Sequence, residues 1–211
     1  MTLIIVDAGL GNIGSVVSMF RRIGHRVRTV DAPCEVDRCD RLVLPGVGAF
    51  DAGMAALAAR GFDTWLCDVV GRGNQLLGIC LGMQLLFECS EEGTREGLGL
   101  IGGQVVRIPA ERAELRLPHM GWNIARPVRD NPLLQMGDDE QRFYFVHSYC
   151  VRCADPADEL AVTDYAGPFT SVVGRRNLFG VQFHPEKSHR FGMALLERFA
   201  TAPLVPGLET E

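Results

Sequence analysis

Residues 75–84 read Gln75-Leu-Leu-Gly-Ile-Cys-Leu-Gly-Met-Gln84, an apolar run that reaches a cysteine between two glycines. The run from 75 to 79 is typical of a buried strand, and we expect a helix from about 81 to 89. Small residues two positions before and two after a nucleophile, at a strand-to-helix turn, are the pattern of a nucleophile elbow. This turn would present Cys80 at the end of the sheet and at a helix N-terminus, whose dipole favours thiolate over thiol. A buried structural cysteine is the alternative, which the flanking glycines disfavour.

A thiolate nucleophile requires a base, and residues 183–186, Phe-His-Pro-Glu, supply one. The residue before a proline is held extended, and side chains two apart in an extended segment face the same way. His184 is therefore the candidate base and Glu186 the carboxylate that orients it. The alternative is a chance surface turn. The remaining histidines lack a carboxylate two residues on, namely His25, His119, His147 and His189.

A glycine turn, Leu44-Pro-Gly-Val-Gly48, follows another apolar run. Ligands of open α/β sheets bind at the carboxyl ends of the strands, where this turn is expected. The backbone amides of Gly46, Val47 and Gly48, together with that of Leu81, are candidates for an oxyanion hole. An ordinary strand-to-helix turn is the alternative. Thiolate, imidazole, carboxylate and amide donors together indicate acyl transfer through a thioester.

The pattern around these motifs predicts the fold. The first half alternates apolar strands with amphipathic helices, which is typical of an open, mostly parallel α/β sheet flanked by helices. Its strands are expected at 3–6, 25–30, 42–44 and 75–79, and its helices at 13–23, 49–59, 62–70 and 81–89. The second half has short strands with few helices between them, which indicates an antiparallel extension. These strands are expected at 104–108, 143–147, 160–165, 169–173 and 179–183, before a closing helix at 188–200 capped by Ser188.

Composition bounds the function. The chain has 211 residues, which suits one domain; we expect it to cover residues 1–200, with a frayed tail at 201–211. The 21 Lys and Arg against 26 Asp and Glu give a net charge of -5, which disfavours nucleic-acid binding. No apolar run reaches the ~18 residues of a membrane span, and the N-terminus does not resemble a signal peptide. We therefore expect a cytoplasmic protein whose seven cysteines are reduced. Cys150-x-x-Cys153, with the irregularly spaced Cys34 and Cys39 as a second half, is a weak zinc signal, so no metal is predicted.

The first glycine cluster allows a function of another class. Gly9, Gly11 and Gly14 match G-x-G-x-x-G between a predicted strand and a predicted helix, and Asp31 ends the next strand. This arrangement is typical of a Rossmann-type dinucleotide-binding module. Asp7 argues against it, because a carboxylate at that place would repel a pyrophosphate.

Several motifs resemble a known family. The stretches Gly78–Gln84, Pro45–Gly48 and Gly180–Ser188 resemble those of class I (triad-type) glutamine amidotransferases. Pro118–Asn123 and Phe143–Tyr149 are similar to the glutaminase subunits of imidazole glycerol phosphate synthases within that family. The resemblance runs from Val6 to about Phe199. One departure is Ala8, where the family more usually has an aromatic or hydroxyl residue.

The resemblance implies a role for each motif and no cofactor. Cys80 would attack the side-chain amide of L-glutamine, and His184, oriented by Glu186, would move the protons. The turn Gly46-Val47-Gly48 and the amide of Leu81 would hold the oxyanion. Residues implied to bind the glutamine α-amino and α-carboxyl groups are Gln84, Glu92, His147, Ser148 and Tyr149.

The resemblance also implies a partner, a (βα)8-barrel synthase (cyclase) subunit that forms a heterodimer with the glutaminase and receives its ammonia. Its products are imidazole glycerol phosphate and AICAR, in histidine biosynthesis. The residues implied to dock on the barrel are Asn12, Pro118, His119, Met120, Gly121, Trp122 and Asn123. Two alternatives share the triad. One is a paralogue that supplies ammonia for acetamidino sugars of surface polysaccharides, and the other is a stand-alone cysteine hydrolase of γ-glutamyl compounds.

Overall fold

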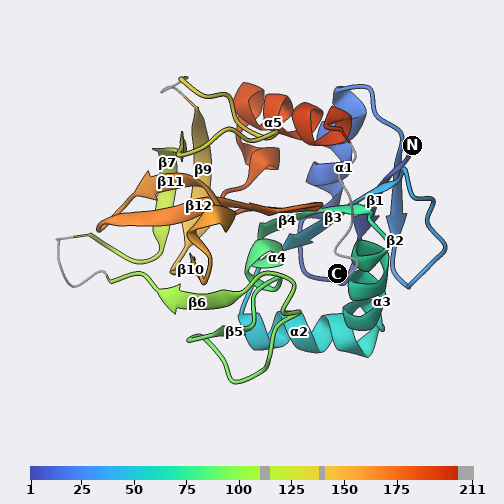
Figure 1. The fold of residues 1–211 in the computed structure, drawn as a ribbon, viewed down its shortest axis with the longest axis horizontal. Helices are drawn as coiled ribbons and strands as arrows, with labels where there is room; N and C mark the ends of the chain where they lie inside the picture. Colours follow the sequence, from blue (N-terminus) through green and yellow to red (C-terminus); the bar gives the residue numbers. More distant parts are fainter. Residues whose placement is uncertain (110–114, 138–140, 204–211) are drawn as a thin grey trace.

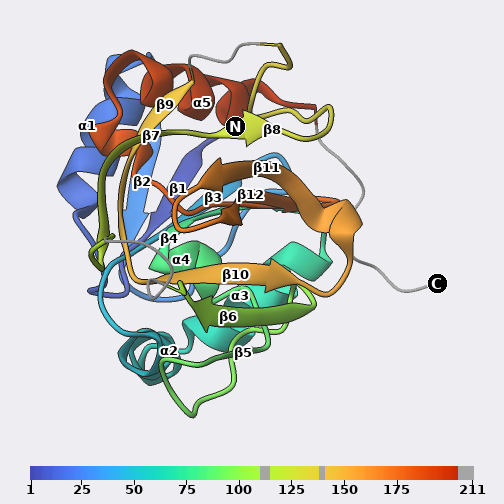
Figure 2. The same ribbon diagram turned by 90° about the vertical axis from the view of Figure 1, so that its left-hand side faces the viewer.

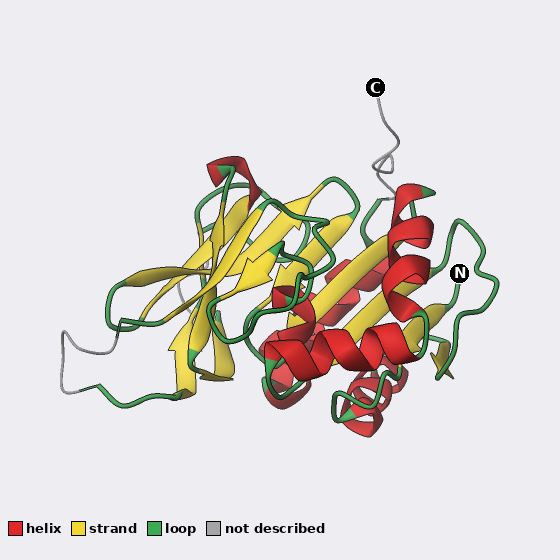
Figure 3. Ribbon diagram, turned by 90° about the horizontal axis from the view of Figure 1, so that it is seen from below, coloured by secondary structure: helices red, strands yellow, loops and turns green. Residues whose placement is uncertain are grey.

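The protein is described here by a computed structural model that covers residues 1–109, 115–137 and 141–203. Its main sheet changes character halfway across, from parallel to antiparallel (Figure 1, Figure 3). The parallel half runs in the order β2 (Val27–Val30), β1 (Leu3–Val6), β3 (Arg41–Gly46), β4 (Gln75–Cys80) and β13 (Leu178–Val181). This arrangement confirms the predicted open α/β sheet.

The antiparallel half continues the same sheet from β13. It adds β12 (Pro168–Arg175), β10 (Tyr149–Cys153) and β6 (Gly103–Arg107), with the short parallel strand β5 (Cys89–Ser90) at the edge. β11 (Glu159–Asp164) branches from β12 and pairs on its other side with β8 (Arg126–Pro127), and the 3₁₀ turn η2 (Pro156–Asp158) precedes β11. A separate two-stranded sheet pairs β7 (His119–Ile124) with β9 (Arg142–His147). The predicted antiparallel extension is therefore present.

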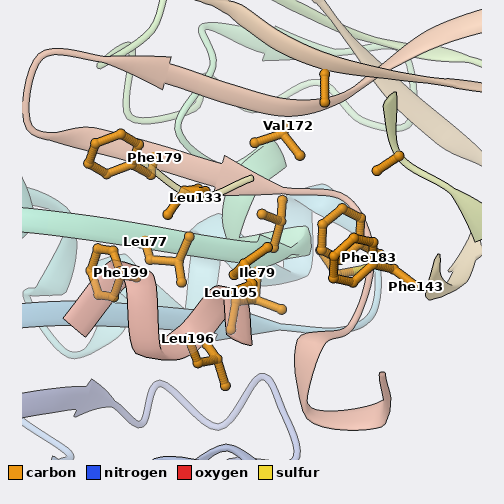
Figure 4. Close-up of a cluster of buried hydrophobic side chains, with 14 of the residues drawn as sticks. Leu77, Ile79, Leu133, Phe143, Val172, Phe179, Phe183, Leu195, Leu196 and Phe199 are labelled. Atoms are coloured by element: carbon orange, nitrogen blue, oxygen red, sulfur yellow. The ribbon is translucent and has the colours of Figure 1, made fainter. Parts of the chain in front are cut away.

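Two layers of helices cover the parallel strands. On one face lie α1 (Ile13–Arg22) and α5 (His189–Thr201), and on the other α2 (Phe50–Ala59) and α3 (Phe62–Gly71) (Figure 2). Alternation along β1 separates the two cores, because Leu3 and Ile5 pack with the first pair of helices and Ile4 and Val6 with the second. The core beneath α5 is rich in aromatic rings (Figure 4). Within the described residues, no helix has the length and apolarity needed to cross a membrane.

The helix predicted after Cys80 is wrong in length. α4 covers only Leu81–Gln84, a single turn. The carbonyls of Leu85, Leu86 and Phe87, which a longer helix would use internally, accept hydrogen bonds from backbone amides of residues 98–101. A glycine-rich loop thus takes the place of the second turn. The helix-dipole contribution at Cys80 is smaller than expected, since it grows with the number of aligned peptides.

Three smaller predictions also differ. β3 continues through Pro45 to Gly46 instead of ending at the proline. Ser188 precedes α5, but its hydroxyl makes no capping bond to the helix. The predicted tail begins at 201, yet Thr201 still belongs to α5, and the carbonyl oxygens of Ala202 and Pro203 accept side-chain hydrogen bonds; the rest, 204–211, lies outside the described residues.

Arg41 fixes the end of α5 to the sheet. Its guanidinium lies in the interior, with the residue 3% exposed, and donates to Gln75 Oε1 at 2.6 Å and to the carbonyls of Phe199 and Ala202. We expect Arg41→Met, which keeps the apolar stem, to lower the free energy of unfolding by roughly 3 kcal/mol, because several hydrogen-bond acceptors lose their donor. Chemical denaturation measures this, with exposed Arg26→Met as the control. Equal stability of the two variants would contradict the anchoring role.

Candidate active site

Cys80 occupies a strained turn at the end of β4. Its backbone has φ 54° and ψ -112°, a region that non-glycine residues rarely adopt. The turn is closed by glycines: a Cβ on Gly78 would lie 2.6 Å from the carbonyl oxygen of Gly82, and a Cβ on Gly82 would overlap the backbone of Leu44. The predicted elbow geometry is therefore present, and only glycine fits at both flanking positions. Cys80 is 7% exposed and lines a cavity.

His184 and Glu186 face each other beyond the end of β13. His184 Nδ1 lies 2.7 Å from Glu186 Oε1, and both side chains are almost completely buried. The backbone of His184 is held by its amide, which donates to Tyr144 O at 2.9 Å, and by its carbonyl, which accepts from Ser188 Oγ at 2.6 Å. The hydroxyl of Ser188 thus orients the candidate base instead of capping α5. His184 Nε2 is buried without a hydrogen-bond partner among the described residues, so it can exchange a proton with Cys80 or a substrate.

Electrostatics make this imidazole basic. Burial lowers the pKa of His184, but the interactions with Cys80 and with Glu186 raise it by more, to about 9. At neutral pH the ring is therefore protonated. Since this pKa lies above the ordinary value of 6.5, the stabilisation from this site is complete below pH 6.5 and is lost as pH rises through 9.

One cavity of about 320 Å³ gathers most of the predicted site. It is lined by Val47, Gly48, Cys80, Leu81, Gln84, Glu92, Pro118, Val146, His147, Ser148, Tyr149 and His184. Of the residues predicted for catalysis, the oxyanion and glutamine binding, two do not line it. Glu186 lies behind His184, and Gly46 pairs with Cys80 in the sheet, where a Cβ would lie 2.7 Å from the amide of Gly82.

The polar side chains of the cavity are held by their neighbours. Gln84 donates through Nε2 to Tyr149 O at 3.0 Å and to Gln182 Oε1 at 3.1 Å. Glu92 Oε2 accepts the amide of Phe50, the first residue of α2, at 2.8 Å. Gln182, which we did not predict, is completely buried, and its Nε2 lies 3.8 Å from Cys80 Sγ. Its place two residues before His184 in an extended segment is the signal that could have identified it.

The amide of Val47 is not available as an oxyanion donor in this conformation. It donates instead to the carbonyl of Leu10, in the first glycine loop. The amide of Leu81 begins α4, where a backbone N–H has no acceptor within the helix. The predicted set of oxyanion donors is therefore only partly arranged. The Val47 peptide must rotate before its N–H can face the cavity.

The residues implied to dock on a partner divide into two groups. Met120 and Trp122 are 61% and 48% exposed and lie on β7, where we expected no strand. Asn12 is also exposed and caps α1 by accepting the amide of Ser15. Pro118 is exposed as well and also lines the cavity, while Gly121 and Asn123 are half-buried. The prediction that His119 lies on the surface was wrong, because His119 is only 3% exposed. Side chains alternate along a strand, so His119 points inward while Met120 and Trp122 point outward.

Two backbone amides at the first glycine loop are already bonded to side chains. The carboxylate of Asp7 accepts the amide of Gly9 at 3.0 Å, and the side chain of Asn12 takes up an amide at the start of α1. These are the groups with which a dinucleotide site would hold a pyrophosphate. The loop geometry therefore disfavours the dinucleotide-binding alternative.

Among the residues that the structure describes, Cys150 and Cys153 on β10 do not belong to a metal-ligand group. Burial raises the pKa of Cys150 to about 11 and that of Cys153 to about 12, so both thiols stay protonated at neutral pH. Across residues 1–109, 115–137 and 141–203, no group of three or more His, Cys, Asp or Glu side chains is placed to hold a metal ion.

A cysteine on a strained elbow, a buried His–Glu pair and a cavity at the ends of parallel strands are features of a triad-type amidotransferase. The profile of the family "Glutamine amidotransferase class-I" matches residues 4–202, and the chain belongs to this family. Solved structures share the fold: a glutamine amidotransferase with a TM-score of 0.71 at 18% identity (93% of this chain, 96% of that one), and PurLQS from Thermotoga maritima with 0.72 at 16% (94% and 96%).

Curated relatives are more similar and carry a more specific name, imidazole glycerol phosphate synthase subunit HisH. The protein of Symbiobacterium thermophilum is 48% identical, with 92% of this chain and 91% of the relative covered. That of Salinibacter ruber is 46% identical, with 94% of each chain covered. The "HisH 2" protein of Pseudomonas aeruginosa is 43% identical over 93% of this chain and 98% of its own length. The comparisons confirm the resemblance drawn from the motifs.

Proposed function

We propose that this chain is the glutaminase subunit of an imidazole glycerol phosphate synthase, and that it hydrolyses L-glutamine to glutamate and ammonia with Cys80, His184 and Glu186. The observation that carries the proposal is the shared cavity: Cys80 and His184 line it together, and Glu186 holds His184 from behind at 2.7 Å. The name of the curated relatives supports the histidine pathway over the surface-polysaccharide paralogue.

The chemistry follows from the positions of the groups. The Cys80 thiolate adds to the carboxamide carbon of glutamine, and the oxygen takes up the charge beside the amide of Leu81 and, after rotation, that of Val47. The His184 imidazolium then protonates the departing nitrogen, which leaves as ammonia, and a γ-glutamyl thioester remains on Cys80. The neutral imidazole next removes a proton from water, which attacks the thioester and releases glutamate. Glu186 keeps the imidazole in one orientation through both steps.

The cavity provides partners for both ends of glutamine. Its α-ammonium group needs acceptors, which the carboxylate of Glu92 and nearby carbonyls supply. Its α-carboxylate needs donors, which the segment Ser148–Tyr149 offers. Both N–H groups of Gln84 Nε2 are bonded to protein oxygens, so Gln84 must release one of them to donate to glutamine. His147 lies deeper in the wall, with its ring nitrogens engaged by protein groups. We assign it to shaping the pocket and not to direct contact with glutamine.

The exposed residues beside the cavity provide a docking surface. Met120 and Trp122 are large apolar side chains in contact with water, and Trp122 stacks on His189 with 5.5 Å between ring centroids. Exposed aromatic and methionine side chains are typical anchors of protein interfaces. Pro118 belongs both to this surface and to the cavity, so a (βα)8-barrel cyclase docked here would receive ammonia without its release to water. The heterodimer would then make imidazole glycerol phosphate and AICAR in the cytoplasm.

Docking should control activity. The isolated chain is expected to hydrolyse glutamine about 100-fold or more slowly than the complex, because the amide of Val47 is bonded to Leu10 and one oxyanion donor is worth roughly 10²–10³ in rate. Glutamate release by the chain alone and with its barrel partner, with and without the acceptor ribotide, measures this. Rapid turnover by the chain alone would favour the stand-alone hydrolase.

The pH profile should show a basic limb set by the Cys80–His184 pair. The imidazolium is the acid that protonates departing ammonia, so glutaminase activity should fall as pH rises through about 9. In Glu186→Gln the negative charge that raises the pKa of His184 is lost, and the basic limb should move to lower pH. Initial rates of the wild type and of Glu186→Gln across the alkaline range give the basic limb of each protein. An unshifted limb in Glu186→Gln would show that Glu186 does not act on the imidazole.

A further inference from the structure

Two buried histidines connect β7, the strand that carries Met120 and Trp122 of the docking surface, with the wall of the cavity. His119 on β7 and His147 on β9 are 3% and 6% exposed, and His119 Nδ1 lies 3.0 Å from His147 Nε2. The two strands are paired so that these residues stand directly opposite each other. Neither ring contacts Cys80 or His184 by a hydrogen bond. They lie outside the catalytic triad but next to it.

The positions of the ring protons follow from the partners. His147 Nδ1 lies 2.8 Å from the carbonyl oxygen of Tyr149, which can only accept, so this nitrogen carries the hydrogen. In a neutral ring, Nε2 of His147 must then accept, and the donor is Nδ1 of His119. By the same reasoning Nε2 of His119 is an acceptor. The hydrogen bonds therefore run in a single direction, from β7 toward the cavity.

Asn123, at the β7 end of this series of hydrogen bonds, indicates the same direction independently. Asn123 Nδ2 lies 3.2 Å from His119 Nε2, which is a donor facing the expected acceptor. The amide of Asn123 cannot be reversed, because its Nδ2 also faces the carbonyl of Asp164 at 3.0 Å and its Oδ1 accepts the amide of Ile124 at 2.8 Å. All three hydrogen bonds from Asn123 to Tyr149 are thus satisfied only when both histidines are neutral and carry hydrogen on Nδ1.

The surroundings keep the rings neutral and in place. His119 is stacked between Phe145, at a centroid distance of 4.8 Å, and Tyr165, at 4.0 Å. His147 packs against Phe169 at 5.1 Å. Burial in this aromatic environment lowers the pKa of His119 to about 4 and, as the largest of several causes, that of His147 to about 3. Neither ring can therefore serve as an acid or a base near neutral pH.

We propose that His119 and His147 are positioning residues that hold the Ser148–Tyr149 wall of the glutamine pocket and tie it to the docking strand β7. We call the series of hydrogen bonds Asn123–His119–His147–Tyr149 the relay. The carbonyl of Tyr149 accepts His147 Nδ1–H and also the side-chain amide of Gln84, so the relay fixes the carbonyl that orients Gln84, a proposed glutamine-binding residue. On β7, His119 is buried and points into the protein, while its neighbour Met120 is exposed on the docking surface. A partner that presses on β7 therefore acts on the pocket wall through His119. This inference rests on the proposed function.

The tautomers provide a direct test that requires neither glutamine nor the partner. In the full chain labelled with ¹⁵N-histidine, long-range ¹H–¹⁵N spectra at neutral pH should show both rings neutral and protonated on Nδ1, with assignments from the single variants. A solvent-exposed histidine prefers hydrogen on Nε2, so the expected pattern is distinctive. An imidazolium, or hydrogen on Nε2 of either ring, would overturn the proposal.

Two matched variants test what the relay does. The amide of asparagine reaches the δ position of a histidine ring, and the amide of glutamine the ε position. His119→Asn therefore keeps a donor toward His147, whereas His119→Gln removes it. In the complex, we expect His119→Gln to raise KM for glutamine about tenfold, the effect of losing one hydrogen bond of a buried group, with kcat within about threefold; His119→Asn should stay within about threefold of wild-type KM.

The outcomes separate this inference from the proposed function. Equal KM values for His119→Gln, His119→Asn and the wild type would overturn the relay and leave the triad untouched. An equal rise in both variants would show that His119 acts only by filling space, which also overturns it. Continued glutamine use by Cys80→Ser would instead refute the proposed function. Variants that fail to dock, recognised by loss of co-purification with the partner, are judged by the ¹⁵N tautomers of His147.

Discussion

Cys80→Ser is expected to abolish glutamine-dependent synthesis by the complex, with a loss of about 10⁴-fold or more, while added ammonium still supports synthesis. Removal of the nucleophile of a triad costs this much because the remaining groups act only through it. Ammonium bypasses the glutaminase and reaches the partner's site directly. The measurement is the rate of product formation with saturating glutamine and, separately, with ammonium. Retention of the glutamine-dependent rate would refute the proposed role of Cys80.

Cys89→Ser is a matched control for this experiment. Cys89 lies on β5, is exposed and does not line the cavity, so its loss should leave both activities unchanged. If Cys80→Ser lost the ammonium-dependent rate as well, co-purification with the partner would show whether docking had failed. Loss of both activities in a variant that folds and docks would contradict a role confined to glutamine hydrolysis.

His184→Ala should reduce glutaminase activity by about 10³-fold or more, because a single imidazole serves as acid in the first step and as base in the second. The buried carboxylate of Glu186 would also lose its partner. Steady-state glutamate release by the complex measures the loss. His25→Ala is the control, since His25 pairs with Glu197 at 2.7 Å and does not line the cavity. A rate within tenfold of wild type would remove His184 from its proposed role.

The sequence was sufficient to predict the placement of the candidate triad. The two glycines around Cys80 allow only a tight strand-to-helix turn. The proline between His184 and Glu186 restricts the backbone between them, although Pro185–Lys187 form a 3₁₀ turn and not the extended segment that we predicted. Both constraints are local, so they can be inferred without knowledge of the rest of the fold. The unbroken apolar run of β1 is likewise a local pattern, and together with the alternation of strands and helices along the first half it predicted the parallel half of the sheet.

The features that could not be predicted depend on contacts distant in sequence. The orientation of the Val47 peptide is set by the carbonyl of Leu10, and nothing in the turn itself favours either direction. The shortening of α4 depends on amides of residues 98–101, which compete for its carbonyls. Apolar residues continue through Leu85, Leu86 and Phe87, so the sequence indicates a longer helix than the one that forms.

The sequence also could not predict which side chains of residues 118–123 are buried and which are exposed. Residues 118–123 contain a glycine and a proline and gave no alternation strong enough to predict β7. Without the strand, the inward direction of His119 and the outward directions of Met120 and Trp122 cannot be separated. The buried partner Gln182 was missed because its residue type alone does not distinguish a cavity wall from a surface.

The most direct test of the catalytic assignment is to identify the atom that carries the γ-glutamyl group. The complex would be quenched in acid during turnover of glutamine, digested, and analysed by peptide mass spectrometry. We predict the acyl group on the peptide that contains Cys80, as an acid-stable thioester that hydroxylamine removes. Acylation of another residue, or rapid glutamine hydrolysis with no acyl-enzyme under conditions that trap thioesters, would contradict the assignment.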